Sequence, residues 1–277
     1  MLQQTQVDRV IPLYGRFLLA FPTLQDLAIA STREVIQAWQ GLGYYRRAVR
    51  LHQLAKIITT EMQGIIPSNA EELIKLPGIG KYTAAAVACF AFNQQIAAID
   101  VNVSRVLHRV LGKRPQSKSS SPPKDFSNLI DEMLPEGVAA EWNQAIMDIG
   151  AMFCKKGHPL CTTCPLAEAC SFSKHPIQSD TPRSAFCCQA SIKVTPRFKG
   201  STRYFRGRVV RVLSGLEPTA HITFDKLLHT INNNVEEDWK LNPDKFLNLL
   251  RTMAKEGLIS EIKTKKNGNL LAVKLPS

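Results

Sequence analysis

The spacing of apolar residues predicts that the first part of the chain is mainly helical. Apolar residues recur every three to four positions, which places them on one face of a helix. Helices are expected over residues 7–21, 35–39, 48–58, 82–92, 103–111 and 142–153. Pro and Gly residues, such as Pro22, Gly41 and Pro67, mark the turns between them. Residues 1–172 are therefore expected to form one helical domain.

The pattern changes after a second polar segment. The stretch 113–124, KRPQSKSSSPPK, indicates a loop between two helical blocks, and residues 173–201 indicate a linker. Beyond it, helices are predicted over 204–216 and 225–231, and a third begins at Pro243 and ends before Gly257. Two apolar runs then flank Asn267-Gly268, a strong hairpin signal.

Three helices followed by a hairpin predict a small α+β, winged-helix-like domain over residues 202–277. In this interpretation the third helix, or Lys263, Lys265 and Lys266 of the hairpin, contacts DNA. The alternative is that this domain is a packing or partner-binding module.

The net charge of the chain indicates a class of binding partner. The net charge is +12, and from Ser191 onward 16 Lys and Arg stand against 8 Asp and Glu. An excess of this size favours nucleic acid, although a generally basic protein is the alternative. No apolar stretch reaches the ~20 residues that a membrane span needs, and Asp8 interrupts the N-terminal apolar residues, unlike a signal peptide. We expect a cytoplasmic protein with no membrane contact, whose clustered cysteines bind metal in preference to forming disulfides.

A glycine-containing turn joins two predicted helices within SNAEELIKLPGIGKYTAAAVACFAF, residues 68–92. Ser68 and Glu71 fit a capping box at the start of the first helix. Gly78 and Gly80 allow close approach of the backbone, and the free amide groups of the helix that begins at Lys81 attract a phosphate. The segment is a helix-hairpin-helix candidate.

Two further motifs carry chemistry. Asp100, in AAIDVNVSRVLHRVLG, opens the next predicted helix and could simply cap it. The second motif contains four cysteines with gaps of six, two and five residues. Four thiolates this close in sequence suit a compact metal cluster, with zinc as the alternative. The four are Cys154, Cys161, Cys164 and Cys170, while Cys89, Cys187 and Cys188 lie outside the pattern.

Taken together, LPGIGKYTAAAV, an aspartate about twenty residues later and the cysteine spacing resemble the helix-hairpin-helix base-excision DNA glycosylases. The resemblance covers residues 1–172 and implies a two-lobed helical core with a [4Fe–4S] cluster on the loop 154–170. It implies that Asp100 is the catalytic carboxylate. Lys155, Lys156 and His158 in that loop are expected to face DNA phosphates.

MLQQTQV (1–7) and GLGYYRRA (41–48) are similar to the A/G-specific adenine glycosylases of the MutY type. In that branch Gln4 and Thr5 would contact the lesion strand, and Leu42 and Tyr44 would lie near the base opposite the adenine. Such enzymes flip their target base out of the duplex, and an aromatic side chain can stack in the gap.

Two positions bear on the reaction. Tyr82 stands where bifunctional, endonuclease III-like relatives carry a lysine that forms a Schiff base, so the resemblance implies a monofunctional glycosylase. Asn102 stands where adenine glycosylases carry an asparagine that hydrogen-bonds the catalytic carboxylate, although Val101 replaces a common glycine. Thymine-specific relatives share Tyr82 and Asp100, so a thymine mismatch glycosylase is an alternative.

The sequence departs from the family at its two ends. The family's general acid is a glutamate two residues before the methionine of MLQQT, and Met1 is that methionine. Either the chain begins late and lacks the family's N-terminal segment, or it is a catalytically weak or inactive iron–sulfur DNA-binding protein. At the other end, residues 202–277 are too short for the Nudix-like domain that inspects 8-oxoguanine in many relatives.

The sequence therefore predicts a monomeric, monofunctional adenine-DNA glycosylase of base-excision repair. Its expected substrate is double-stranded DNA containing A:8-oxoguanine or A:G mispairs. The expected reaction is hydrolysis of the N-glycosidic bond of the mispaired adenine.

Overall fold

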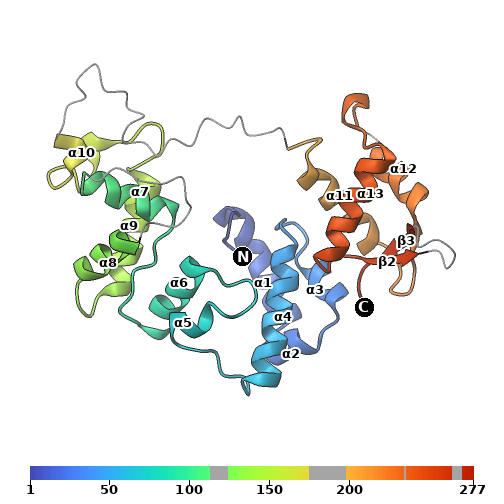
Figure 1. Ribbon diagram of the computed structural model, residues 1–277, viewed down its shortest axis with the longest axis horizontal. Coiled ribbons are helices and arrows are strands. Elements are labelled where there is room, and N and C mark those ends of the chain that lie inside the picture. The colour runs from blue at the N-terminus through green and yellow to red at the C-terminus, as the bar shows by residue number, and fades with distance from the viewer. Residues whose placement is uncertain (113–123, 175–197, 234, 264–269) are drawn as a thin grey trace. The chain divides into compact units, whose positions relative to one another are not determined.

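The computed structural model describes residues 1–112, 124–174, 198–233, 235–263 and 270–277. It contains two compact units (Figure 1). One combines Met1–Ile66 with Pro196–Ser277, and the other is Pro67–Thr195. The chain thus leaves its first unit, builds the second and returns to the first. Most of the predicted linker, 173–201, lies outside the described residues.

The N-terminal part of the first unit consists of helices α1 (Val7–Ala20), α2 (Leu24–Ile29), α3 (Thr32–Ala38) and α4 (Arg46–Glu61). Reciprocal capping boxes begin α2, with Thr23 and Asp26, and α3, with Ser31 and Glu34. Helix α2 was not predicted from the periodicity because its six residues span less than two helical turns. Apolar side chains of all four helices form one core cluster.

The C-terminal part of the first unit has the predicted α+β composition. Its elements are α11 (Thr202–Ser214), β1 (Ile222–Thr223), α12 (Phe224–Asn232), η3 (Glu237–Trp239), α13 (Pro243–Lys255), β2 (Ser260–Lys263) and β3 (Leu270–Lys274). The strands pair antiparallel in the order β1-β3-β2. The predicted turn at Asn267-Gly268, with Lys265 and Lys266, lies outside the described residues. Strand β1, of two residues, was too short to predict from sequence.

Helices α3 and α4 contribute to two cores at once. Val35 and Ala48 pack with α1 and α2. Their chain neighbours Ile36 and Val49 pack instead with the apolar side chains of α11, α12 and α13. Consecutive helical residues point about 100° apart, so a single helix can serve both sides. The C-terminal elements therefore share a core with the N-terminal helices.

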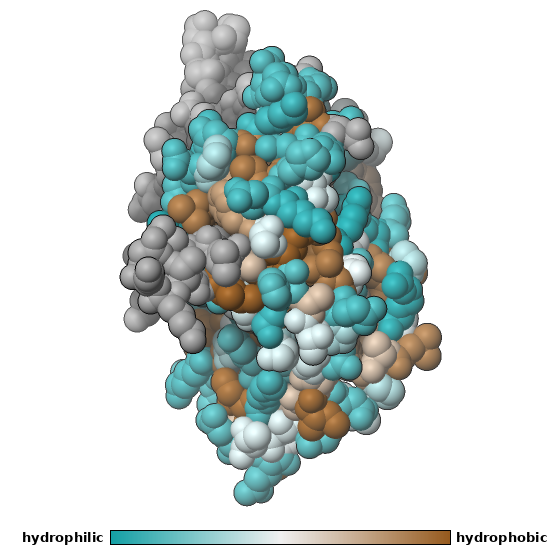
Figure 2. Space-filling model, turned by 90° about the vertical axis from the view of Figure 1, so that its right-hand side faces the viewer, coloured by the Kyte–Doolittle hydropathy of each residue, from teal (hydrophilic) through white to brown (hydrophobic). Residues whose placement is uncertain are grey.

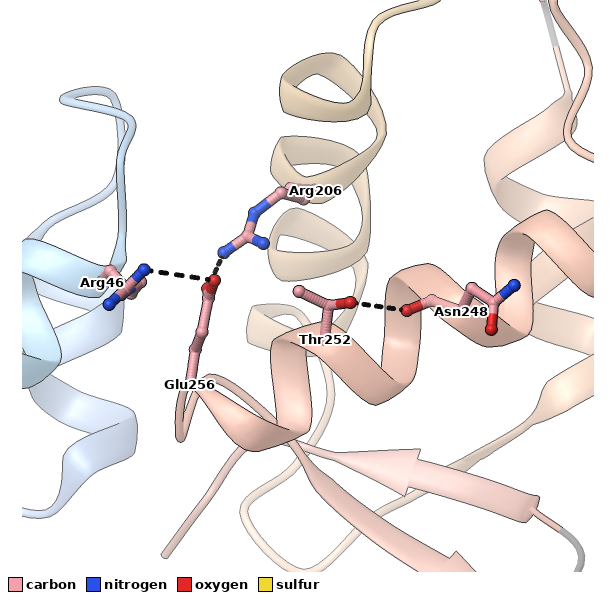
Figure 3. Close-up of polar contacts among 5 residues, drawn as sticks. All are labelled: Arg46, Arg206, Asn248, Thr252 and Glu256. Carbon is pink, nitrogen blue, oxygen red and sulfur yellow. Dashed lines mark hydrogen bonds and ion pairs between the residues drawn. The ribbon is translucent and has the colours of Figure 1, made fainter.

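Polar contacts fix the same junction. At one end of α11, Arg33 donates to the carbonyl of Leu216, and Gln37 Nε2 donates to the carbonyl of Ser214 at 3.0 Å. At the C-cap of α13, Glu256 lies between Arg206 of α11 and Arg46 of α4 (Figure 3). Hydrophilic side chains make up much of the face in Figure 2, and apolar residues appear near its centre and in isolated spots elsewhere. This agrees with the burial of the larger apolar residues of this part in the shared core.

The regular elements of the second unit are all helices within its described residues. Its elements are α5 (Ala70–Leu73), α6 (Lys81–Phe92), α7 (Val101–Val110), α8 (Lys124–Met133), α9 (Ala139–Met152), η1 (Cys161–Thr163) and α10 (Ser171–Lys174). The cap of α5 differs from the prediction. Asn69, not Ser68, is the N-cap, and its Oδ1 accepts from the Glu72 amide at 2.8 Å. The true helix start lies one residue beyond the predicted capping box.

Asn143 of α9 is a fully buried polar residue in this unit. Its Oδ1 accepts from the Ala98 amide at 2.7 Å, and its Nδ2 donates to the carbonyls of Ile96 at 3.0 Å and Ala139 at 2.8 Å. The bonds to Ala98 and Ile96 satisfy two backbone groups of the segment that leads into Asp100. The approach of the chain to α7 is therefore fixed by α9.

The prediction of a mainly α-helical protein with a small α+β C-terminal part is confirmed. Among the described residues, no helix combines the length and apolar character that crossing a bilayer would need.

Candidate functional site

The glycine turn joins α5 to α6 as a helix-hairpin-helix. Gly78 has φ +84°, a conformation that favours glycine, and the Ile79 amide donates to the Leu76 carbonyl at 3.2 Å. Gly80 is the N-cap of α6 and supplies no side chain to the helix start. Gly78, Gly80 and Lys81 are all exposed. Backbone amides, the positive end of the helix dipole and a lysine therefore meet at a surface suited to a phosphate.

Asp100 is the N-cap of α7, as one of its two predicted roles requires. Its Oδ1 accepts from the backbone amides of Asn102 at 2.8 Å and Val103 at 2.7 Å. Its Oδ2 accepts from Asn102 Nδ2 at 3.0 Å. Three donors thus fix the orientation of the carboxylate, which makes it a preorganised negative charge and not a mobile surface group.

Tyr82, near the start of α6, lies within electrostatic range of Asp100. Burial, followed by the Asp100 carboxylate, raises the pKa of the Tyr82 phenol above its ordinary value. The phenol therefore stays protonated at neutral pH and is not a nucleophile there.

Arg105 connects this carboxylate to the cysteine loop. Its Nη1 donates to Asn102 Oδ1 at 2.8 Å, and its Nε donates to the Cys154 carbonyl at 2.8 Å. Its Nη2 donates to the Gly150 carbonyl of α9 at 3.0 Å. Helices α7 and α9 can approach closely here because residue 150 is a glycine. A Cβ at this position would lie 3.3 Å from the Cβ of Asn102. A continuous series of hydrogen bonds therefore links Asp100 through Asn102 and Arg105 to the carbonyl of Cys154.

The four predicted cysteine ligands line a single cavity, together with Arg109 and Phe172. Burial raises the pKa of the Cys161 thiol, and neighbouring Cys170, Cys154 and Cys164 raise it further, so the four sulfurs interact electrostatically. Within the described ranges no three or more His, Cys, Asp or Glu residues are already drawn together as a metal site. The loop therefore places the four thiols around one cavity.

The surroundings of Arg109 indicate whether this cavity suits a negatively charged metal–thiolate cluster. It is 3% exposed and donates to Cys154 Sγ at 3.2 Å and to the carbonyls of Lys155 at 3.0 Å and Lys156 at 3.2 Å. Among the described residues no carboxylate forms an ion pair with it, and its Nε has no hydrogen-bond partner. A buried cation needs a compensating negative charge. Four thiolates around a metal cluster would supply that charge, so the residues fit the group.

The two N-terminal motifs lie in the first unit and carry unusual backbone conformations. Gln4 has φ +56° and Tyr44 has φ +48°, in the left-handed region that residues with side chains rarely adopt. Such strain often accompanies binding sites. Tyr44 is 39% exposed, so its ring is accessible to a ligand.

Arg47 of α4 joins the two motifs. It donates to the carbonyls of Met1 at 2.7 Å and of Gln3, and to Thr5 Oγ1 at 2.8 Å. It also donates to the carbonyls of Leu42 and Gly43 within its own motif. One guanidinium thus donates hydrogen bonds to carbonyls of both motifs. The Thr5 hydroxyl accepts one of its hydrogen bonds and so has a partner within the protein.

Leu42 is buried in this structure. It is 2% exposed and packs in the core with Trp39 and Ala48, and its predicted place near the base opposite adenine stays a prediction. Leu42 holds the turn that presents Tyr44.

We expect Arg47→Ala to lower the free energy of unfolding by about 2–4 kcal/mol, because it leaves several partly buried carbonyls without a donor. Urea unfolding followed by circular dichroism measures the change. The matched control is Arg50→Ala, which removes an exposed charge from the same helix and should change stability by less than about 0.5 kcal/mol. Equal shifts in the two variants would contradict this role of Arg47.

The predicted site residues fall into two groups. Gly78, Gly80, Lys81, Tyr82, Asp100, Asn102 and the four cysteines belong to the second unit, and Gln4, Thr5, Leu42 and Tyr44 belong to the first. Sequence reasoning missed Arg47, Arg105 and Arg109, although Arg105 and Arg109 stand four residues apart, on one face of the predicted helix.

A rigid carboxylate at a helix start, a helix-hairpin-helix and a four-cysteine loop define the class of DNA glycosylases with helix-hairpin-helix folds. Residues 1–132 match the HhH-GPD superfamily base excision DNA repair proteins. The chain belongs to this superfamily, and within it to the adenine DNA glycosylases of the MutY type.

Named relatives support that assignment. The chain is 36% identical over 219 residues to the adenine DNA glycosylase of Mycobacterium tuberculosis, covering 78% of this chain and 68% of the relative. It is 44% identical over 171 residues to the adenine DNA glycosylase of Rattus norvegicus, covering 61% of this chain but 33% of the relative.

Solved structures show the same fold. A thermostable thymine-DNA glycosylase matches with a TM-score of 0.57 at 29% identity, covering 62% of this chain and 79% of its own. A non-covalent endonuclease III–DNA complex matches with a TM-score of 0.55 at 26% identity, covering 62% and 78%. The prediction of a DNA N-glycosylase family is confirmed.

Proposed function

We propose that the protein is a monofunctional glycosylase that removes adenine mispaired with 8-oxoguanine or guanine by hydrolysing its N-glycosidic bond. The observation that carries the proposal is Asp100, fixed by three hydrogen bonds at the start of α7 and adjacent to the hairpin helix that bears Tyr82. The adenine glycosylase relatives supply the choice of base.

Asp100 would act on the sugar. Breaking the bond to adenine leaves an oxocarbenium-like sugar, and a nearby carboxylate stabilises that positive charge while water adds. Asn102 keeps both the position and the charge of this group by donating to Oδ2, while the backbone amides hold Oδ1. The carboxylate does not need to reorganise as charge develops.

The tyrosine at position 82 supports the proposal that the enzyme does not cleave the DNA strand. A lyase step needs an amine that forms a Schiff base with the opened sugar, and a protonated phenol cannot form one. Lys81 is adjacent in sequence, but the neighbouring position on a helix points about 100° away.

The same two groups of residues would bind double-stranded DNA. The amides at Gly78 and Gly80, with Lys81, would hold a phosphate near the flipped nucleotide. Gln4 and the ring of Tyr44 would contact the strand that carries the base opposite adenine, with Tyr44 stacking in the gap left by flipping.

The four cysteines Cys154, Cys161, Cys164 and Cys170 would hold a [4Fe–4S] cluster. When bound, the cluster supplies four iron–thiolate bonds that close the loop 154–170 around one centre. Arg109 would stay beside the Cys154 sulfur, and through its bonds to the Lys155 and Lys156 carbonyls it would hold this exposed turn toward DNA phosphates. Lys155, Lys156 and His158 are all exposed there.

A glycosylase assay on end-labelled duplexes tests the function. We expect abasic sites, revealed by alkali, in duplexes with A:8-oxoguanine or A:G and not in A:T or G:T duplexes. Strand cleavage without alkali would contradict the monofunctional mechanism. Release of thymine from G:T, with no release of adenine, would establish the thymine-specific alternative.

A further inference from the structure

We propose that Arg203 is a specificity-determining positioning residue, which directs the Tyr44 hydroxyl as a hydrogen-bond donor toward an acceptor atom of the purine opposite the excised base. The inference rests on the proposed function and adds to it a residue from the C-terminal part of the chain. That part lies beyond residues 1–132, the region that matches the superfamily.

The contact between Arg203 and Tyr44 is direct. Arg203 Nη1 donates to Tyr44 Oη at 2.6 Å, and the guanidinium carbon lies 5.7 Å from the centroid of the tyrosine ring. Arg47 lies 5.5 Å from the same centroid. Two arginines therefore lie against this ring, one from α4 and one from α11. Tyr44 itself has a φ of +48°.

Arg203 is delivered by a rigid element. Ser201 caps α11, and its Oγ accepts from the Tyr204 amide at 3.3 Å. Further along α11, Phe205, Val209 and Leu213 are buried in the core shared with α3 and α4. Arg206 binds Glu256, which also pairs with Arg46, two residues from Tyr44 (Figure 3). The start of α11 is thereby held next to the turn that presents Tyr44.

This geometry gives the phenol a defined polarity. Its oxygen accepts a hydrogen bond from a cation, so its own hydrogen is directed elsewhere and becomes a stronger donor. Guanine and 8-oxoguanine present acceptor oxygens and nitrogens on their edges. An aromatic ring alone stacks on any base, whereas an oriented hydroxyl distinguishes bases by their acceptors. Arg203 would thus convert a stacking residue into a base-reading one.

A binding experiment separates this role from simple phosphate contact. In an Asp100→Asn background, which is expected to turn over the duplex about 10³-fold more slowly, fluorescence anisotropy gives the dissociation constants for A:8-oxoguanine and A:T duplexes over a range of salt concentrations. Arg203→Ala should lower the ratio of the two affinities about tenfold. Tyr44→Phe, which removes only the hydroxyl, should lower it equally, and the double variant should lose no more than about twofold beyond either single one.

The matched control is Arg211→Ala, which removes an exposed arginine of the same helix and should leave the ratio unchanged. If Arg203→Ala weakened both duplexes equally and reduced the salt slope by about one, Arg203 would be a phosphate contact and the proposal would be wrong. An unchanged ratio in a parent protein that prefers the mispair would also overturn it. A parent that shows no preference would instead contradict the proposed function.

A charge-preserving variant provides a second test, in case Arg203→Ala lowers the stability of the protein. Arg203→Lys retains the positive charge but loses the planar group over the ring. It should keep the affinity for the A:T duplex and still lose most of the preference for the mispair. Full retention of the preference by Arg203→Lys would show that the planar guanidinium is not needed and would overturn the role assigned to Arg203.

Discussion

Replacement of Asp100 by Asn is expected to reduce the single-turnover rate of adenine release by about 10³-fold while the protein stays folded. Removal of one preorganised electrostatic stabiliser typically costs about 10²–10³-fold. Asparagine is as good an N-cap as aspartate, so its side-chain oxygen can still accept the amides of Asn102 and Val103. The substitution therefore removes the charge and keeps the cap. Rapid-quench kinetics on the A:8-oxoguanine duplex measures the rate, and thermal unfolding measures stability.

Asp148→Asn is the matched control for this experiment. Asp148 is an exposed carboxylate of α9 in the same unit, where it accepts from Gln144 Nε2 at 3.0 Å. The same change of charge there should leave the rate within about twofold of the original, as expected of a surface position. If Asp100→Asn retained the full rate of adenine release, Asp100 would have no catalytic role.

Replacement of Cys161 by Ser is expected to remove the metal from the protein. A [4Fe–4S] cluster is held by four thiolates and contains four iron atoms. A serine hydroxyl, with a far higher pKa than a thiol, is a much weaker ligand for iron than a thiolate. We expect iron and sulfide, measured by colorimetric analysis, to fall to less than about a quarter of the wild-type content. Affinity for DNA should fall as well, since the exposed turn at Lys155 and Lys156 loses its support.

Cys89→Ser provides the control for the loss of metal. Cys89 is buried in α6, and its sulfur accepts from Asn143 Nδ2 at 3.3 Å, a bond that a serine oxygen can also accept. Iron content should be unchanged in this variant. If wild-type protein contained zinc in place of iron, or if Cys161→Ser kept its iron, the proposed cluster would be wrong.

The sequence predicted the elements whose signals are local. The hairpin glycines, the aspartate at the start of α7 and the three C-terminal helices follow from residues close together in the chain. The cap of α5 was misplaced by one residue because Ser68 and Asn69 are both good caps, and the difference depends on which amide each reaches. The burial of Leu42 was missed because its motif indicates a turn, and a turn says little about which side chain points inward.

Long-range contacts were outside the reach of sequence reasoning. Nothing near Arg105 indicates that its side chain bridges Asn102 and the carbonyl of Cys154, 49 residues away. Arg203 and Tyr44 are separated by 159 residues, and the division of Ile36 and Val35 between two cores becomes visible only when α11 is placed. The candidate site could thus be predicted as a set of residues but not as a network.

Helices α3 and α4 contribute side chains to two cores, and this has a consequence for folding during synthesis. As the chain leaves the ribosome, Ile36 and Val49 emerge early but find their packing partners only after Phe205 and Phe246 have been synthesised. The middle unit, built from contiguous residues, can form in the meantime. A premature stop codon after the cysteine loop would therefore leave every glycosylase motif intact and still expose an apolar face on the N-terminal helices.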